Sequence, residues 1–159
     1  MAVSTASHAH SYAIALGSNR CGRHGGPAAE VRAALAAMGG VVAASRIIET
    51  APVGPSIRRF VNAAAIISTD EAPPELLARA KTIERAFGRR RGERWAARVI
   101  DIDLILWSGG AWFSRGLTLP HPAFRDRAFV LRPLAQIAPD WREPITGLTI
   151  RQLAYRLQG

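Results

Sequence analysis

The chain of 159 residues has very little of what would define several other classes of protein. Its single cysteine, Cys21, excludes an internal disulfide framework and agrees with a reducing compartment. It has no apolar run near the ~18 residues of a membrane span. The first ten residues have neither a basic segment nor an apolar core, so they do not form a secretory signal. We expect a cytoplasmic protein with a flexible tail over residues 1–10 and a single domain over residues 11–159.

Acidic residues and lysine are also scarce. There are 12 Asp and Glu residues against 21 Lys and Arg residues, which gives a formal net charge of +9, and Lys81 is the single lysine. This excess of arginine favours anionic partners, namely nucleotides, phosphorylated metabolites or nucleic acids. Composition does not choose among them. We interpret the lone Cys21 as a structural residue rather than a nucleophile.

Hydrophobic periodicity and turn signals predict an alternation of strands and helices. Strands are expected over residues 11–16, 41–48, 60–68 and 99–107, a short edge strand within 112–118, helices over 28–38, 73–87 and 150–157, and a strand or turn over 129–137. The first six elements follow the order strand–helix–strand–strand–helix–strand of a split βαβ unit. The predicted fold class is therefore α+β: a ferredoxin-like sandwich of two or three layers, with helices packed on a mostly antiparallel central sheet.

Two carboxylates lie two residues apart inside the apolar run 99–106. Side chains alternate faces along a strand, so Asp101 and Asp103 are expected to point to the same side. Two like charges at that distance disfavour each other's ionisation unless a cation lies between them, and Mg²⁺ prefers oxygen ligands. A salt-bridged structural pair is the alternative. The apolar flanks indicate a central strand, where unpaired carboxylates would be costly, and they favour the metal.

The most basic segment, Arg89–Arg98, comes directly before this strand. Arginine forks match phosphate oxygens, and Trp95 among them could stack on a flat ring. A solvated surface loop is one alternative. A nucleic-acid-binding loop is another, although such loops interleave several aromatic residues with the basic ones and this one has only Trp95. An acid pair beside an arginine cluster predicts a site for magnesium and a polyphosphate.

Two further segments carry polar side chains in rigid surroundings. His121 lies between two prolines and is followed six residues later by Arg127, so both are candidate phosphate ligands. Residues 50–55 form a Pro- and Gly-rich turn that leads to Phe60 and Asn62. The Asn62 amide could read the edge of a heterocycle on which Phe60 stacks, but a plain turn followed by a strand explains the pattern equally well.

The glycine-rich segment Gly17–Arg23 is not a Walker A loop, because it lacks the G-K-[ST] ending that supplies the lysine and the metal-binding hydroxyl. A tight turn after the first strand accounts for its glycine, serine and asparagine residues.

Taken in order, these segments resemble the 6-hydroxymethyl-7,8-dihydropterin pyrophosphokinase family of the folate pathway. The matching segments are residues 15–19 (ALGSN), 49–55 (ETAPVGP), 60–64 (FVNAA), 83–84 (IE), 88–91 (GRRR), 93–95 (ERW) with Arg98, 101–103 (DID), 119–122 (LPHP) with Arg127, 129–131 (FVL) and 137–139 (IAP). Each is weak alone, whereas the ordered set is highly specific. The stretches after Pro55 and after Arg91 are shorter than the family pattern.

The resemblance implies transfer of diphosphate from the co-substrate ATP to the hydroxymethyl group of 6-hydroxymethyl-7,8-dihydropterin, which leaves AMP. It implies two Mg²⁺ ions held by Asp101 and Asp103, and a monomer that binds neither nucleic acid nor membrane. The implied catalytic residues are Arg89, Arg98, Asp101 and Asp103. The implied ATP contacts are Glu84, Arg89, Arg91, Arg98, His121 and Arg127, and the implied pterin contacts are Thr50, Val53, Phe60, Asn62, Trp95 and Phe129.

Two other functions stay open at this stage. A basic nucleic-acid-binding module using Arg89–Arg98 would bind with a strong salt dependence and would not need Asp101 or Asp103. A family relative that kept the fold and lost activity is the second. The intact set of Asp101, Asp103, Arg89, His121 and Asn62 argues against such decay.

Overall fold

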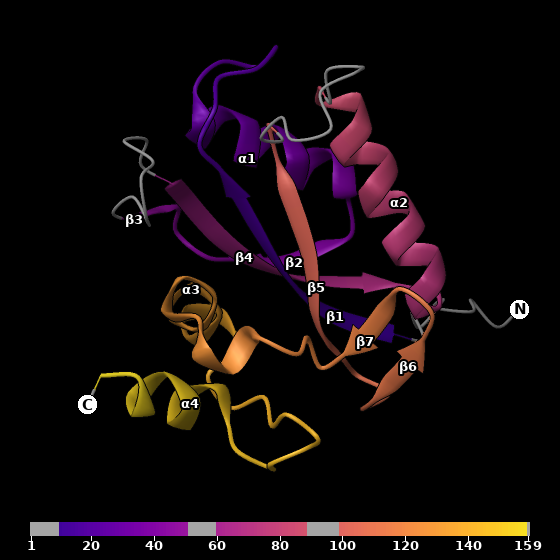
Figure 1. Ribbon diagram of the computed structural model, residues 1–159, viewed down its shortest axis with the longest axis vertical. Helices are drawn as coiled ribbons and strands as arrows, with labels where there is room; N and C mark the ends of the chain where they lie inside the picture. The colour runs from indigo at the N-terminus through magenta and orange to yellow at the C-terminus, as the bar shows by residue number, and fades with distance from the viewer. Residues whose placement is uncertain (1–9, 51–59, 89–98, 159) are drawn as a thin grey trace, which may run out of the picture.

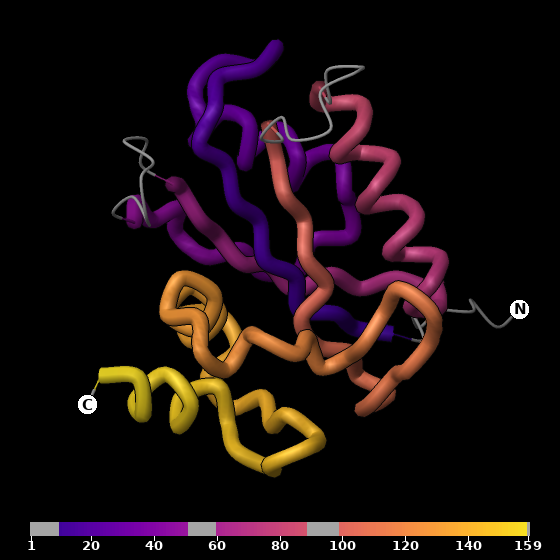
Figure 2. The backbone as a smooth tube through the Cα atoms, in the orientation of Figure 1, coloured from indigo at the N-terminus to yellow at the C-terminus, as the bar shows by residue number. Residues whose placement is uncertain are grey.

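The computed structural model describes residues 10–50, 60–88 and 99–158. Residues 1–9 of the predicted tail and the segments 51–59 and 89–98 lie outside them, whereas His10, the last residue of the predicted tail, is the first residue of a strand. Figure 1 shows the elements in space, and Figure 2 traces the path of the backbone between them. In chain order they are β1 (His10–Ser18), α1 (Pro27–Met38), β2 (Val41–Ala44), β3 (Ile48–Thr50), β4 (Phe60–Thr69), α2 (Pro73–Ala86), β5 (Asp101–Trp107), β6 (Trp112–Ser114), β7 (Leu117–Leu119), the 3-10 helix η1 (Phe124–Asp126), α3 (Ala128–Ile137) and α4 (Ile150–Arg156).

Local sequence sets the ends of the first two helices. α1 begins at Pro27 and α2 at Pro73, positions where the missing N–H costs nothing and the fixed φ suits a helix. After α1 the chain turns sharply at Gly39 and Gly40, which have φ values of 64° and 63°. A Cβ on Gly40 would lie 2.7 Å from the Ser68 carbonyl oxygen, so the turn can approach β4 only with glycine there.

The main sheet has the order β2-β4-β1-β5, with β3 also paired to β4, and every pair is antiparallel. This is the strand order of the split βαβ unit, so the predicted ferredoxin-like sheet is confirmed. The predicted strand over 41–48 was wrong in one respect, since it divides into β2 and β3. Between them the Arg46 N–H is donated to the Gln136 side chain of α3, at 3.0 Å, and not to β4.

Helices cover both faces of the sheet, which makes the fold a sandwich of three layers (Figure 1). Alternate residues of β1 separate the two cores: Tyr12 and Ile14 pack with α1 and α2, whereas Ala13 packs with α3 and α4. The strand or turn predicted over 129–137 was wrong, because this segment is the helix α3. Its β-branched and aromatic residues and Pro133 favour other structures locally, but Val130, Leu131 and Leu134 form one buried stripe against the sheet.

β5 lies at the edge of the main sheet and not in its centre, which corrects the prediction drawn from its apolar flanks. At this edge the Glu84 carboxylate of α2 accepts the Ile102 N–H at 2.8 Å. This bond satisfies one N–H group that an edge strand would otherwise leave without a ladder partner. The predicted edge strand within 112–118 is a two-stranded hairpin, β6–β7, in which Trp112 pairs with Leu119 and Ser114 pairs with Leu117.

In the parts of the chain that the structure describes, no helix combines the length and the apolar character that crossing a bilayer requires.

Candidate active site

Three neighbouring strands bring the predicted polar residues into one row. Gly17 of β1 pairs with Asn62 of β4 on one side and with Asp101 of β5 on the other. In the next row that faces the same way, Ala15 pairs with Ala64 and Asp103. Facing residues of adjacent strands project on the same side, here the side that α3 covers. Asp101 and Asp103 therefore lie on one face of β5, as predicted, and the structure adds that Asn62 shares this face of the sheet.

Small residues form the floor between these polar groups. Gly17 has no side chain and Ala15 has only a methyl group, so the sheet surface between the amide and the carboxylates is open. A Cβ on Gly17 would lie 3.0 Å from the Asn62 Oδ1. Glycine therefore keeps the amide in its present position.

The Asn62 side chain is nearly buried and is held by its neighbour on β3. Its Nδ2 donates to the Thr50 Oγ1 at 3.0 Å, and only 7% of Asn62 is exposed. Phe60 pairs with Thr50 and, two residues before Asn62, lies on the same face of β4. Phe129 in the first turn of α3 is 38% exposed, with the Arg127 guanidinium 5.7 Å from its ring centroid. The structure thus brings Thr50, Phe60 and Asn62 together, and Phe129 lies at the start of α3, the helix that packs on β4.

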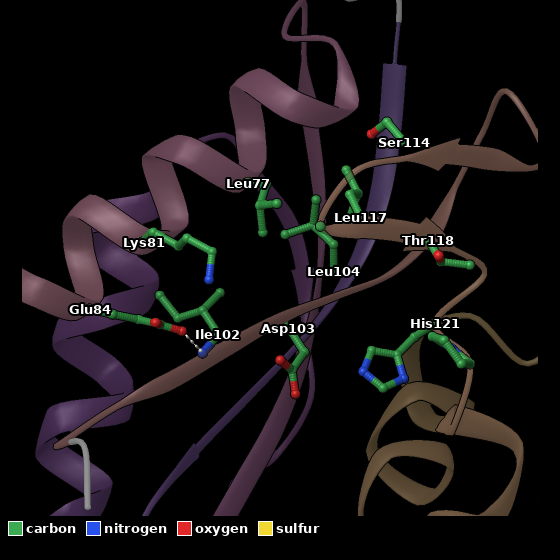
Figure 3. A pocket seen from close by; sticks show the side chains of 12 residues that line it. Leu77, Lys81, Glu84, Ile102, Asp103, Leu104, Ser114, Leu117, Thr118 and His121 are labelled. Atoms are coloured by element: carbon green, nitrogen blue, oxygen red, sulfur yellow. Dashed lines mark hydrogen bonds between the residues drawn. The ribbon is translucent and has the colours of Figure 1, made fainter. Parts of the chain in front are cut away.

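His121 faces Asp103 from the segment after β7 (Figure 3). Its backbone N–H donates to the Ile105 carbonyl oxygen of β5 at 2.9 Å. Its ring Nδ1 accepts the Ala123 N–H at 3.1 Å, so the neutral ring carries its proton on Nε2. Burial lowers the pKa of His121 below its ordinary 6.5; the Asp103 charge opposes this shift and the Arg127 charge adds to it. At neutral pH the ring is therefore an uncharged N–H donor beside a carboxylate.

A pocket of about 360 Å³ lies between α2, β5 and the β6–β7 hairpin. Its lining combines apolar side chains with a few polar ones, a composition typical of small-molecule sites. Figure 3 shows the apolar residues Leu77, Leu104 and Leu117 and the polar residues Lys81, Glu84, Asp103 and His121. Glu84, a predicted ATP contact, reaches β5 between the two aspartates through its hydrogen bond to the Ile102 N–H.

Sequence reasoning missed Lys81 and the hairpin wall of this pocket. Lys81 extends from α2 into the pocket, one helical turn before Glu84 (Figure 3). Two signals could have found it, namely its being the single lysine of the chain and its i,i+3 spacing from Glu84. Thr118 and Ser114 of the hairpin also line the pocket, and nothing in their local sequence marks them.

Five predicted site residues lie outside the described part of the chain: Val53, Arg89, Arg91, Trp95 and Arg98. The described chain stops at Gly88, two residues after the end of α2, and resumes at Val99, two residues before Asp101. The Val99 carbonyl oxygen accepts a hydrogen bond from the Ser18 hydroxyl at 2.6 Å, which fixes the approach to β5.

The acid pair fits magnesium only if a phosphate completes the site. Over residues 10–50, 60–88 and 99–158, no group of three or more His, Cys, Asp or Glu side chains could hold a metal. Mg²⁺ is usually bound by one or two carboxylates together with water and substrate phosphates. Asp101 and Asp103 on one face of β5 meet that need.

The fold is thus an α+β sandwich on a split βαβ sheet, and an acid pair beside a mixed pocket is an arrangement suited to metal-assisted group transfer. The family model for 7,8-dihydro-6-hydroxymethylpterin-pyrophosphokinase matches residues 13–139, and the chain belongs to this family. The family predicted from the order of the motifs is therefore confirmed, as is the prediction of a diphosphokinase of folate biosynthesis.

Curated relatives named 2-amino-4-hydroxy-6-hydroxymethyldihydropteridine pyrophosphokinase agree with this assignment. The Methylorubrum extorquens protein is 45% identical over 118 residues, which are 74% of this chain and 73% of the relative. The Pseudomonas aeruginosa protein is 39% identical over 137 residues, 82% of each chain. The Synechocystis protein is 44% identical over 100 residues, and the chain spans about half, 51%, of that relative's length.

Among solved structures, wild-type HPPK-DHPS of Plasmodium falciparum matches 92% of this chain and 41% of its own, with a TM-score of 0.72 and 15% identity. This likeness supports the fold alone.

Proposed function

We propose that the protein transfers the diphosphate of ATP to the hydroxymethyl group of 6-hydroxymethyl-7,8-dihydropterin and releases AMP. The reaction takes place on the face of the sheet that carries Asn62 of β4 and the two aspartates of β5. One observation carries the proposal: Asn62 of β4 lies across β1 from the two aspartates of β5, and the pocket lined by Asp103 and His121 lies on the opposite side of β5. Two substrates placed there meet at the carboxylates. Transfer of this kind depends mainly on positioning and on stabilising charge.

The pterin is assigned to the Asn62 side. The amide offers a donor and an acceptor to the edge of the ring, and Thr50 sets its orientation. Phe60 and Phe129 supply aromatic faces for stacking. Val53 and Trp95, which lie outside the described residues, complete this group of contacts in the proposal.

ATP is assigned to the pocket between α2, β5 and the hairpin. His121 donates its Nε2–H to a phosphate oxygen, Arg127 adds a fixed charge, and Glu84 lines the wall. Arg89, Arg91 and Arg98 supply further phosphate contacts, with Arg89 and Arg98 acting in catalysis.

Asp101 and Asp103 would hold two Mg²⁺ ions. When bound, such ions neutralise phosphate charge and orient the reacting oxygens. The rest of the proposal follows the sequence: one domain over residues 11–159, acting as a cytoplasmic monomer without nucleic acid or membrane.

The test is AMP formation from ATP and magnesium, with and without the dihydropterin. We expect pterin-dependent AMP in a one-to-one ratio with the pterin diphosphate. ATP binding without AMP would point to a different acceptor or to a relative that has lost activity. Absence of ATP binding would overturn the proposal and direct the next assay to nucleic acids.

A further inference from the structure

A buried carboxylate lies outside the proposed site, in the segment between α3 and α4. Glu143 has no exposed surface. Its oxygens accept the Ile145 N–H at 2.9 Å, the Thr146 N–H at 2.7 Å and the Thr146 hydroxyl. These bonds fold residues 143–146 around the carboxylate.

The same carboxylate forms a bidentate ion pair with Arg125 of η1. The Arg125 Nη2 lies 2.7 Å from the Glu143 Oε2, and the Arg125 Nε lies 3.2 Å from the Oε1. Two parallel N–H bonds fix orientation as well as distance. Burial raises the pKa of Glu143, but the hydrogen bonds from Arg125, Thr146 and Ile145 outweigh it and lower that pKa to about 2.

Arg125 lies in the sequence between His121 and Arg127, two residues of the proposed nucleotide site. Its guanidinium lies 4.9 Å from the ring centroid of the buried Phe124. The Phe124 N–H donates to the His121 carbonyl oxygen, and the Arg127 N–H donates to the Phe124 carbonyl oxygen, at 3.3 and 3.2 Å. The turn from His121 to Arg127 is thus held internally by short-range hydrogen bonds and externally by the ion pair between Arg125 and Glu143.

We propose that Glu143 is a positioning residue for nucleotide binding: through Arg125 it holds the turn 121–127 so that His121 and Arg127 face the phosphates. This inference rests on the proposed function, because that function assigns the two residues to ATP. Glu143 itself touches neither substrate in this assignment.

The kinetic test compares Glu143→Gln with the wild type. The neutral amide keeps the volume of the side chain and loses the charge that holds Arg125. We expect the KM for ATP to rise about five- to tenfold, while kcat and the KM for the pterin change less than about twofold. Arg125→Met should act alike, and the double variant should be no worse than the more severe single one, because both remove one interaction. Additive effects would contradict action through Arg125.

Two variants serve as matched controls. Thr146→Val loosens the same loop and leaves the Arg125–Glu143 ion pair in place. Glu71→Gln cuts a similarly built pair, in which the Arg79 Nε lies 2.9 and 3.0 Å from the Glu71 oxygens, near the start of α2. Both should leave the KM for ATP unchanged. A rise equal to that of Glu143→Gln in either control would mean general loosening and would overturn the proposal.

A second readout does not depend on turnover. Without ligands, amide exchange at Ala123, whose N–H is held by the His121 ring, should speed up in Glu143→Gln and in Arg125→Met but not in Thr146→Val. Unchanged exchange in the first two variants would overturn the positioning role even if the KM values moved. If the wild type formed no AMP, the proposed function would fail, and this exchange result would still decide whether Glu143 holds the turn.

Discussion

At the scale of single residues, the candidate site depends on what separates its polar groups as much as on the groups themselves. Gly17 and Ala15 keep the sheet surface open between Asn62 and the two aspartates. His121 meets the pair from a different element, with its ring oriented by the Ala123 N–H. Asn62 and His121 are thus each held by a neighbour before any substrate arrives, which lowers the cost of ordering the site.

Asp103→Asn tests the role of the acid pair. The variant keeps the shape of the side chain and removes one metal-binding charge, so AMP formation should fall about 10²- to 10³-fold. The melting temperature should stay the same or rise, because a like charge beside Asp101 is removed. Asp140→Asn is the control, since Asp140 is an exposed partner of Arg151 far along the chain. Near-normal activity of Asp103→Asn would contradict the metal assignment.

Gly17→Ala tests the floor of the pterin side. The added methyl group would lie 3.0 Å from the Asn62 Oδ1, so the amide must shift. We expect the KM for the pterin to rise about tenfold and the KM for ATP to stay within about twofold. Gly26→Ala is the matched control, because a Cβ there meets nothing within 4 Å. Equal KM values for both variants would mean that the floor does not set the position of Asn62.

At the scale of elements, α3 contributes both to the packing of a core and to the surroundings of Arg127. Its buried stripe packs against β4 and β1 in the core that also contains Ala13, and its first turn contains Phe129, which is partly exposed beside Arg127. The chain passes from β7, whose Leu117 and Leu119 lie in the core with α1 and α2, to α3 in the other core, and the connecting segment contains His121 and η1. The stability of this layer therefore supports the geometry of the site.

Leu131→Ala measures how much α3 contributes to stability. Leu131 is fully buried, so truncation should lower the free energy of unfolding by about 2–5 kcal/mol. Urea denaturation followed by circular dichroism gives this value. Arg132→Ala, at an exposed position of the same helix, should change it by less than about 0.5 kcal/mol. A small loss in Leu131→Ala would mean that the second core tolerates a cavity without cost.

The loop between α3 and α4 should make folding sensitive to acid. The pKa of Glu143 is about 2 in the folded chain and near 4.5 when unfolded, so its ionised form stabilises the fold above pH 4.5. That contribution, at most about 3 kcal/mol, is lost as the pH falls from 4.5 to 2. Glu143→Gln should flatten the stability curve in this window and should be less stable than the wild type at pH 7. An unchanged curve would show that Glu143 does not titrate with folding.

At the scale of the whole molecule, sequence patterns predicted what depends on short-range periodicity. Apolar runs and the order of strands and helices predicted the sheet, and the spacing of Asp101 and Asp103 predicted their shared face. The division of 41–48 could not be predicted, because it depends on Gln136, about 90 residues further along the chain. The helix α3 was missed for a related reason, since burial against the sheet outweighs the local preference of residues 129–133.

The irregular pairing in the middle of β5 limits how the protein can change in length. The register between β1 and β5 shifts by one residue between Ala13 and Ile14, so Ile105 and Leu106 both enter the second core. Removing one residue at this point would restore strict alternation and turn one half of the strand over. Either the carboxylates would face the core with α1 and α2, or Leu106 would leave the core with α3 and α4. Over evolutionary time β5 should therefore accept substitutions but not insertions or deletions, and variation in chain length should collect in the connecting loops.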